Sequence, residues 1–87
     1  VIRVIHTPGH TPGGCSLYFE ERKLVVTGDT LFADSIGRTD LPGGSFETIV
    51  ASIRNKLFTL PDETVVIPGH GPSTTIGHEK RHNEYLR

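Results

Sequence analysis

The sequence contains a single cysteine and no methionine among its 87 residues. One cysteine, Cys15, excludes a disulfide bond within the chain, and this favours a reducing compartment such as the cytoplasm. The chain begins with Val1 and not with methionine, and its first residues already have the pattern of a strand. We therefore interpret the sequence as a fragment of a longer protein.

Long hydrophobic runs and an excess of one charge are also missing. The longest apolar stretches are roughly four or five residues, whereas a membrane helix needs about 20. The formal net charge is −1, from 9 Lys and Arg and 10 Asp and Glu residues. No signal-peptide pattern is present, and neither a nucleic-acid partner nor a membrane partner is indicated. A domain of this size buries only a modest core and is marginally stable without help.

The apolar pattern predicts a small α/β fold. Strands are expected at residues 1–5, 15–20, 24–27 and 64–67, and a helix after Ser45 with apolar residues at helical spacing. A second helix is expected at 76–86, capped by Thr75 or Thr74, and residues 30–44 form a long loop. Short links make the first three strands antiparallel neighbours, whereas the helical crossover makes the fourth parallel to the third.

Polar residues follow three of these strands in glycine-rich loops: His10, Asp29 and His70. The topology brings the three loops to one edge of the sheet, where ligand sites usually lie. Imidazole and carboxylate groups suit zinc, iron and manganese. The trio is therefore interpreted as metal ligands, either of a catalytic zinc site, of a two-histidine, one-carboxylate iron site, or of part of a two-metal site.

Other chemically active residues are given structural roles. His6 is expected to pack or hydrogen-bond beneath the loop of His10, and Cys15 to be a small buried residue. His78 and His82 lie in His-Glu-Lys-Arg-His, which formally matches a zinc-protease helix. We interpret that match as chance, because the segment is highly charged and shows no apolar face to bury. Arg38 is a candidate for binding a substrate carboxylate, although pinning its loop through Asp34 or Asp40 is favoured.

The phrases around these residues resemble the metallo-β-lactamase superfamily, and more closely its short, glyoxalase II-like hydrolases. The resemblance rests on Thr-Pro-Gly-His-Thr-Pro-Gly-Gly, Gly-Asp-Thr-Leu-Phe, Gly-Arg-Thr-Asp-Leu-Pro-Gly-Gly and Pro-Gly-His-Gly-Pro, in that order. It implies half of an αββα sandwich, with one mixed sheet and helices on one face. It also implies that His10 binds one metal, His70 the other, and that Asp29 bridges both.

The same resemblance implies an activity and a missing part. A metal-bound hydroxide would hydrolyse a thioester of the hydroxyacylglutathione type, with zinc as the expected metal and iron or manganese as alternatives. The family's His-x-His-x-Asp-His motif is absent, so residues 1–87 are expected to be the C-terminal half of the fold and inactive alone. The alternatives are an iron-dependent persulfide dioxygenase and a non-catalytic half-domain that pairs with itself or another half through an exposed apolar face.

Overall fold

The structure is a computed structural model that describes residues 1–86, and its main element is a five-stranded mixed sheet in the order β1-β2-β3-β6-β7. The strands of this sheet are β1 (Ile2–His6), β2 (Cys15–Phe19), β3 (Leu24–Gly28), β6 (Val65–Pro68) and β7 (Thr74–Thr75). A separate two-stranded hairpin and two α-helices complete the fold: β4 (Leu31–Phe32), β5 (Ser35–Ile36), α1 (Phe46–Asn55) and α2 (Ile76–His82). Single 3₁₀ turns lie at η1 (Glu20–Arg22), η2 (Leu57–Thr59) and η3 (Glu84–Leu86).

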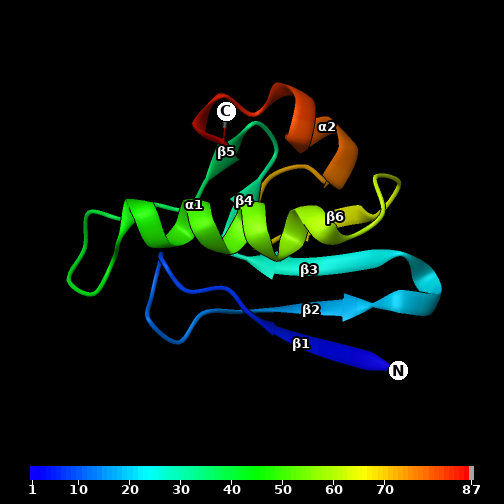
Figure 1. The fold of residues 1–87 in the computed structure, drawn as a ribbon, viewed down its shortest axis with the longest axis horizontal. Coiled ribbons are helices and arrows are strands. Elements are labelled where there is room, and N and C mark those ends of the chain that lie inside the picture. Colours follow the sequence, from blue (N-terminus) through cyan, green and yellow to red (C-terminus); the bar gives the residue numbers. More distant parts are fainter. Residues whose placement is uncertain (87) are drawn as a thin grey trace.

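The strand directions confirm the predicted topology. β1, β2 and β3 pair antiparallel in chain order, and β6 pairs parallel with β3 after the crossover through α1. The C-terminal ends of β1, β3 and β6 therefore point to the same edge of the sheet, as the ribbon in Figure 1 shows.

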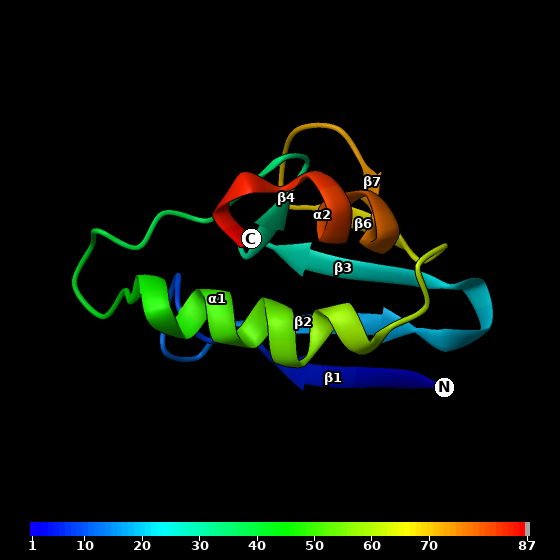
Figure 2. The same ribbon diagram turned by 45° about the horizontal axis from the view of Figure 1, so that its top comes forward.

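One face of the sheet is covered and forms the core. The register aligns Tyr18, Val25 and Val66 across β2, β3 and β6, and all three side chains are buried. α1 lies along this face (Figure 2) and contributes Ile49 and Ile53 to the same apolar cluster. The predicted cap of this helix is confirmed, because the Ser45 hydroxyl accepts the Thr48 backbone N–H at 3.2 Å.

The other face of the sheet is apolar and uncovered. The register aligns Val4 with Leu17 and Val26, and Ile2 with Phe19 and Leu24. Val4 is 63% exposed and Ile2 56% exposed, whereas Tyr18, Val25 and Val66 on the core face are at most 4% exposed. One mixed sheet with helices on one face was the predicted architecture, and the structure confirms it.

Cys15 is exposed, and the prediction of a buried cysteine is therefore wrong. The reason is the alternation of side chains along β2. Ser16 and Tyr18 point into the core and are buried, so Cys15 points to the uncovered face with Leu17.

The loop predicted at 30–44 contains a regular element that the sequence pattern did not indicate. Its first part folds into the β4–β5 hairpin, in which Leu31 pairs with Ile36 and Phe32 with Ser35. Leu31 is fully buried in the core. Two-residue strands are too short for alternation to be recognised, and the same holds for β7.

The C-terminal segment is packed more tightly than predicted. The Thr75 hydroxyl caps α2 by accepting the His78 backbone N–H at 3.1 Å, as expected. The helix ends at His82, and a 3₁₀ turn follows instead of further α-helix. The expectation that this segment has no face to bury is wrong, because Ile76 and Leu86 belong to the core. Within residues 1–86, neither helix has the length and apolar character needed to span a membrane.

Candidate metal centre

The structure brings His10, Asp29 and His70 together at the edge where β1, β3 and β6 end. The Nε2 atom of His10 lies 3.7 Å from Oδ2 of Asp29, and the Nε2 atom of His70 lies 3.9 Å from Oδ1 of Asp29. The predicted convergence of the three loops is thus confirmed. Each histidine faces a different oxygen of the same carboxylate.

His10 is oriented by the main chain of the following loop. Its Nδ1 atom lies 2.8 Å from the carbonyl oxygen of Arg38, so Nδ1–H donates and Nε2 is the nitrogen turned toward Asp29. Metal-binding histidines commonly donate their other ring N–H to a carbonyl or carboxylate, which fixes both tautomer and ring orientation. The His10 ring is thereby held with one nitrogen available to a cation.

His70 is oriented by ring packing. Its imidazole lies against the ring of Phe32 on β4, with 4.7 Å between the ring centroids. The side chain is otherwise 79% exposed, compared with 24% for His10. His70 thus forms the open side of the cluster and His10 the enclosed side.

Two glycines allow the loops to close on Asp29. A Cβ atom at Gly69 would lie 2.8 Å from Oδ1 of Asp29, and one at Gly37 would overlap the Asp29 carbonyl oxygen. Any larger residue would push either loop away from the carboxylate. These glycines set the close approach of the loops that carry the trio.

A cavity of about 510 Å³ opens beside the trio. Its walls come from the β4–β5 hairpin and from the loop that follows His70, and they include Phe32, Ile36 and Pro72. Pockets of this size, mostly apolar with a few convergent polar groups, are typical of small-molecule sites.

The donor set of the trio fits metal ions. Two atoms bound tetrahedrally to one ion at about 2.1 Å lie roughly 3.4 Å apart, close to the 3.7 and 3.9 Å separations on either side of Asp29. Among the described residues, the three ligand atoms of the trio do not all gather within 4.8 Å of one another. A carboxylate with a histidine at each oxygen favours two ions over one ion held by all three residues.

The Arg38 guanidinium is occupied by its own loop. It donates to Asp40 through Nε at 2.8 Å and Nη2 at 3.0 Å, and these hydrogen bonds lower the pKa of the Asp40 carboxyl to about 2. This is the loop-pinning role favoured from the sequence. Arg38 also lines the cavity, so its role toward a substrate stays a prediction.

His6 has the supporting role that was expected. Its Nε2 atom lies 2.9 Å from the carbonyl oxygen of Pro12 and donates to it. The hydrogen bond ties the end of β1 to the far side of the loop that carries His10.

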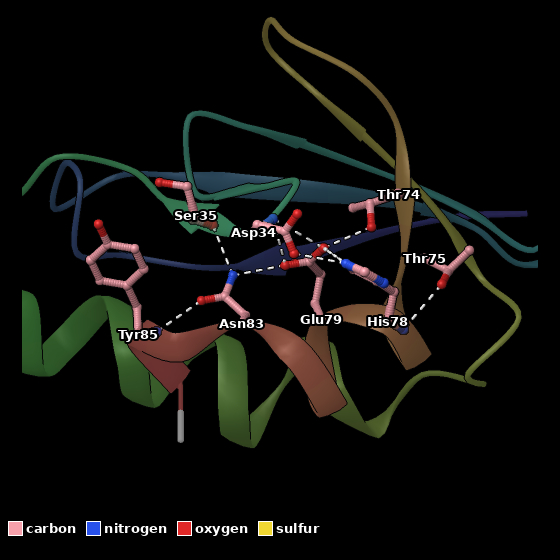
Figure 3. Close-up of polar contacts among 8 residues, drawn as sticks. All are labelled: Asp34, Ser35, Thr74, Thr75, His78, Glu79, Asn83 and Tyr85. Atoms are coloured by element: carbon pink, nitrogen blue, oxygen red, sulfur yellow. Dashed lines mark hydrogen bonds and ion pairs between the residues drawn. The ribbon is translucent and has the colours of Figure 1, made fainter.

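A second polar cluster lies at the tip of the hairpin, away from the trio, and Figure 3 shows its contacts. The donor atoms of Asp34, His78 and Glu79 lie within 4.8 Å of one another. His78 Nε2 donates to Asp34 Oδ1 at 2.7 Å, and the fully buried Glu79 carboxylate accepts from several donors. Here the polar atoms already bind one another, which distinguishes this cluster from the open trio.

Sequence reasoning missed two contributors to the site. The carbonyl of Arg38 carries no residue-type signal, because any residue supplies one. Glu79 stands out in the sequence only through the His-Glu-Lys-Arg-His match, which we interpret as chance, although the Glu-x-x-x-Asn spacing of Glu79 and Asn83 places both on one helix face. Burial of that face was the missing information.

Comparison with known families and proteins gives a consistent assignment. The family described as the metallo-beta-lactamase superfamily matches residues 1–70. A probable metallo-hydrolase of Streptococcus pyogenes is 57% identical over 83 residues, which cover 95% of this chain and 36% of that protein. Hydroxyacylglutathione hydrolase GloC of Haemophilus influenzae is 52% identical over 83 residues, which cover 95% of this chain and 39% of that protein.

Solved structures agree with the sequence relatives. The BLEG-1 B3 metallo-beta-lactamase superposes with a TM-score of 0.95 at 52% identity, covering 98% of this chain and 41% of that one. TTHA1623, in a di-iron-bound form, gives 0.93 at 48% identity, covering 98% and 42%. ETHE1 from Myxococcus xanthus gives 0.89 at 42% identity, covering 95% and 38%. The chain thus spans about two fifths of the length of the proteins it matches.

Proposed function

The chain belongs to the metallo-beta-lactamase superfamily, and from this premise we propose that it is the C-terminal half of a metal-dependent thioester hydrolase of the hydroxyacylglutathione hydrolase type. The observation that carries the proposal is the placement of His10 and His70 at opposite oxygens of Asp29. Similarity to GloC, at 52% identity, supports the substrate class.

In this proposal the trio divides between two ions. His10 would hold one ion, His70 would hold the other, and Asp29 would be shared between them. The metals, zinc in our proposal, would supply Lewis acidity and make water available as a nucleophile near neutral pH. The Arg38 carbonyl keeps the Nε2 atom of His10 directed inward, and the apolar cavity wall around Phe32 and Ile36 limits access of water to the substrate.

The remaining ligands would come from an N-terminal half that carries a His-x-His-x-Asp-His motif. The uncovered face of the sheet supports this, because Ile2, Val4 and Leu17 lie exposed on a surface that a second sheet would cover. We propose that the two halves pack through this face, and that the isolated chain binds metal weakly and is inactive. Self-association through the same face is the alternative. We also propose a cytoplasmic location, because the single cysteine cannot form a disulfide within the chain, and this favours a reducing compartment.

An iron-dependent persulfide dioxygenase is the second candidate. The observation that favours it is the di-iron-bound form of TTHA1623, whose structure is similar to this chain at 48% identity. Two histidines and a carboxylate suit iron as well as zinc. The proposed hydrolase and the dioxygenase therefore differ in metal and co-reactant more than in the ligands of this half.

The test is made on the two-half protein, with this chain joined to an N-terminal half carrying the missing motif. Purified protein is analysed for metal, then assayed for hydrolysis of a hydroxyacylglutathione thioester and for oxygen uptake with a glutathione persulfide. We expect zinc-dependent thioester hydrolysis without oxygen uptake. Iron-dependent oxygen uptake without thioester hydrolysis would overturn the proposal in favour of the dioxygenase.

A further inference from the structure

Building on the proposed function, we propose that Glu79 is a positioning residue for the metal-binding edge. Its buried carboxylate fixes the β4–β5 hairpin and the far end of the His70 loop to helix α2. Through the hairpin, it sets the orientation of His10.

The hairpin is linked to all three members of the trio. Asp29 lies just before Thr30 and β4, Phe32 packs on the ring of His70, and Arg38, just after the hairpin, offers its carbonyl to His10. The base of the hairpin is closed by the Gly37 N–H, which donates to the Thr30 carbonyl at 3.0 Å. A displacement of the hairpin would therefore change the surroundings of each predicted ligand.

Glu79 holds the tip of the hairpin. The backbone N–H of Asp34 donates to Oε1 of Glu79 at 3.0 Å and to Oε2 at 3.3 Å. Asp34 is in the left-handed region, with a φ of 61°, which costs free energy for a non-glycine residue unless its surroundings fix it. The carboxylate of Glu79 supplies that fixation.

The same carboxylate reaches the His70 loop. The hydroxyl of Thr74 donates to Oε2 of Glu79 at 2.7 Å, and Thr74 begins β7 directly after this loop. The Glu79 side chain thus joins the hairpin that follows Asp29 to the end of the loop that carries His70, through Asp34 and Thr74.

Two residues of the C-terminal segment complete the network that Figure 3 shows. The Asn83 amide donates to Oε1 of Glu79 at 2.8 Å and to the Ser35 carbonyl at 3.1 Å. His78 donates to the Asp34 carboxylate at 2.7 Å. Both tie the hairpin to α2 from either side of Glu79.

The network has the properties of a support and not of a metal site. Glu79 is fully buried, and a buried carboxylate is tolerated when its oxygens are hydrogen-bonded. Both oxygens accept strong donors at 2.7 to 3.0 Å, and the Nε2 atom of His78 is already bonded to Asp34. An ion would have to replace these contacts.

The experiment compares Glu79→Ala with Glu79→Gln in the two-half protein. Glutamine has the same shape, accepts from Asp34 and Asn83 through its carbonyl, and donates to the Thr74 hydroxyl through its amide. Glu84→Gln changes an exposed carboxylate in the next turn and is the matched control. The readouts are zinc affinity and the ring nitrogen of His10 that carries the proton, from long-range ¹H–¹⁵N NMR of the metal-free protein at mildly alkaline pH.

We expect His10 to carry its proton on Nδ1 in the wild type, in Glu79→Gln and in Glu84→Gln. In Glu79→Ala, we expect a mixture of tautomers and about 10-fold weaker zinc binding, the range typical of lost outer contacts. Wild-type tautomer and affinity in Glu79→Ala, or equal damage in Glu79→Gln, would overturn the inference. Zinc binding that is weakened equally in Glu79→Gln and Glu79→Ala, and unchanged in Glu84→Gln, would point instead to Glu79 as a metal ligand.

If Glu79→Ala does not fold, Asn83→Ala, which removes only the amide contacts, takes its place with the same expected shift in the His10 tautomer. The tautomer readout also separates the two proposals. Wild-type protein that binds no metal and hydrolyses no thioester would refute the proposed function, whereas the NMR comparison would still decide the role of Glu79.

Discussion

Two clusters of histidine and carboxylate side chains lie near the base and at the tip of the β4–β5 hairpin, and they differ in how many of their polar atoms are hydrogen-bonded. In the trio, both histidine Nε2 atoms stand 3.7 and 3.9 Å from Asp29, too far for a hydrogen bond. In the second cluster, His78 and Asp34 are 2.7 Å apart, and the Glu79 carboxylate accepts from the backbone, a hydroxyl and an amide.

The residue types alone do not separate the clusters, since both offer imidazole and carboxylate. What separates them is the use of the ligand atoms. His10 donates its Nδ1 proton to a carbonyl and keeps Nε2 available, whereas both oxygens of Glu79 already accept hydrogen bonds. An open set of donors beside a cavity is suited to a ligand, and a closed set is suited to holding structure. The comparison therefore predicts opposite responses to mutation.

The largest expected effect is the loss of hydrolysis on Asp29→Asn in the two-half protein. In the proposed bridging role of Asp29, replacing the carboxylate by a weaker amide ligand would remove several kcal/mol of transition-state stabilisation, so kcat/KM should fall about 1,000-fold or more. Asp34→Asn, the same change in the closed cluster, is the matched control and should fall less than about 10-fold. Equal losses in the two variants, measured by steady-state kinetics, would break the distinction.

Zinc affinity should respond to His10→Ala but not to His78→Ala. Removal of a proposed ligand is expected to weaken zinc binding by about 100-fold or more. His78 hydrogen-bonds Asp34 and not the trio, so its loss should change the affinity less than about 3-fold. Competition with a chromogenic chelator measures both. In the isolated chain, micromolar or tighter zinc binding that His10→Ala removes would contradict the proposal that this half needs its partner.

The free energy of unfolding should respond in the opposite order, with the larger loss from a change in the closed cluster. Asn83→Ala removes the amide that donates to the Ser35 carbonyl and to Glu79 and that accepts the Tyr85 backbone N–H. We expect it to lower the free energy of unfolding by about 2 kcal/mol. His70→Ala changes a side chain that is 79% exposed, and a change there should stay within about 0.5 kcal/mol. Urea denaturation of metal-free protein measures the difference. A larger loss for His70→Ala would show that the trio is itself structural.

The sequence was sufficient to predict the open cluster because its signals are local. Each of His10, Asp29 and His70 follows a strand, and the connections between strands determine that these ends meet. The predicted parallel pairing of β3 and β6, confirmed in the register of Val25 with Val66, is what brings His70 to Asp29.

The closed cluster was not predictable in the same way, because its contacts depend on packing between distant segments. Asp34 and Glu79 are 45 positions apart, and their hydrogen bond requires the hairpin and α2 to meet. The wrong prediction that Cys15 is buried has a related cause. A strand's alternation shows which residues share a face, but the covering layer decides which face is buried.

The smallest expected effect concerns Arg38. Its carbonyl accepts from His10 of the trio, and its guanidinium donates to Asp40 in its own loop. Hydrogen bonding by that guanidinium lowers the pKa of Asp40 from 3.8 to about 2. Since the folded-state pKa is depressed, the pair stabilises the loop above the ordinary pKa of Asp40 and loses that effect as the pH falls through about 2. In Arg38→Gln, NMR titration should find the pKa of Asp40 raised toward its ordinary value, with the backbone hydrogen bond to this carboxyl still lowering it in part. Because the carbonyl remains, zinc affinity should change less than about 3-fold, as for an exposed ion pair; a loss as large as that of His10→Ala would show that the guanidinium, and not the main chain, supports the open cluster.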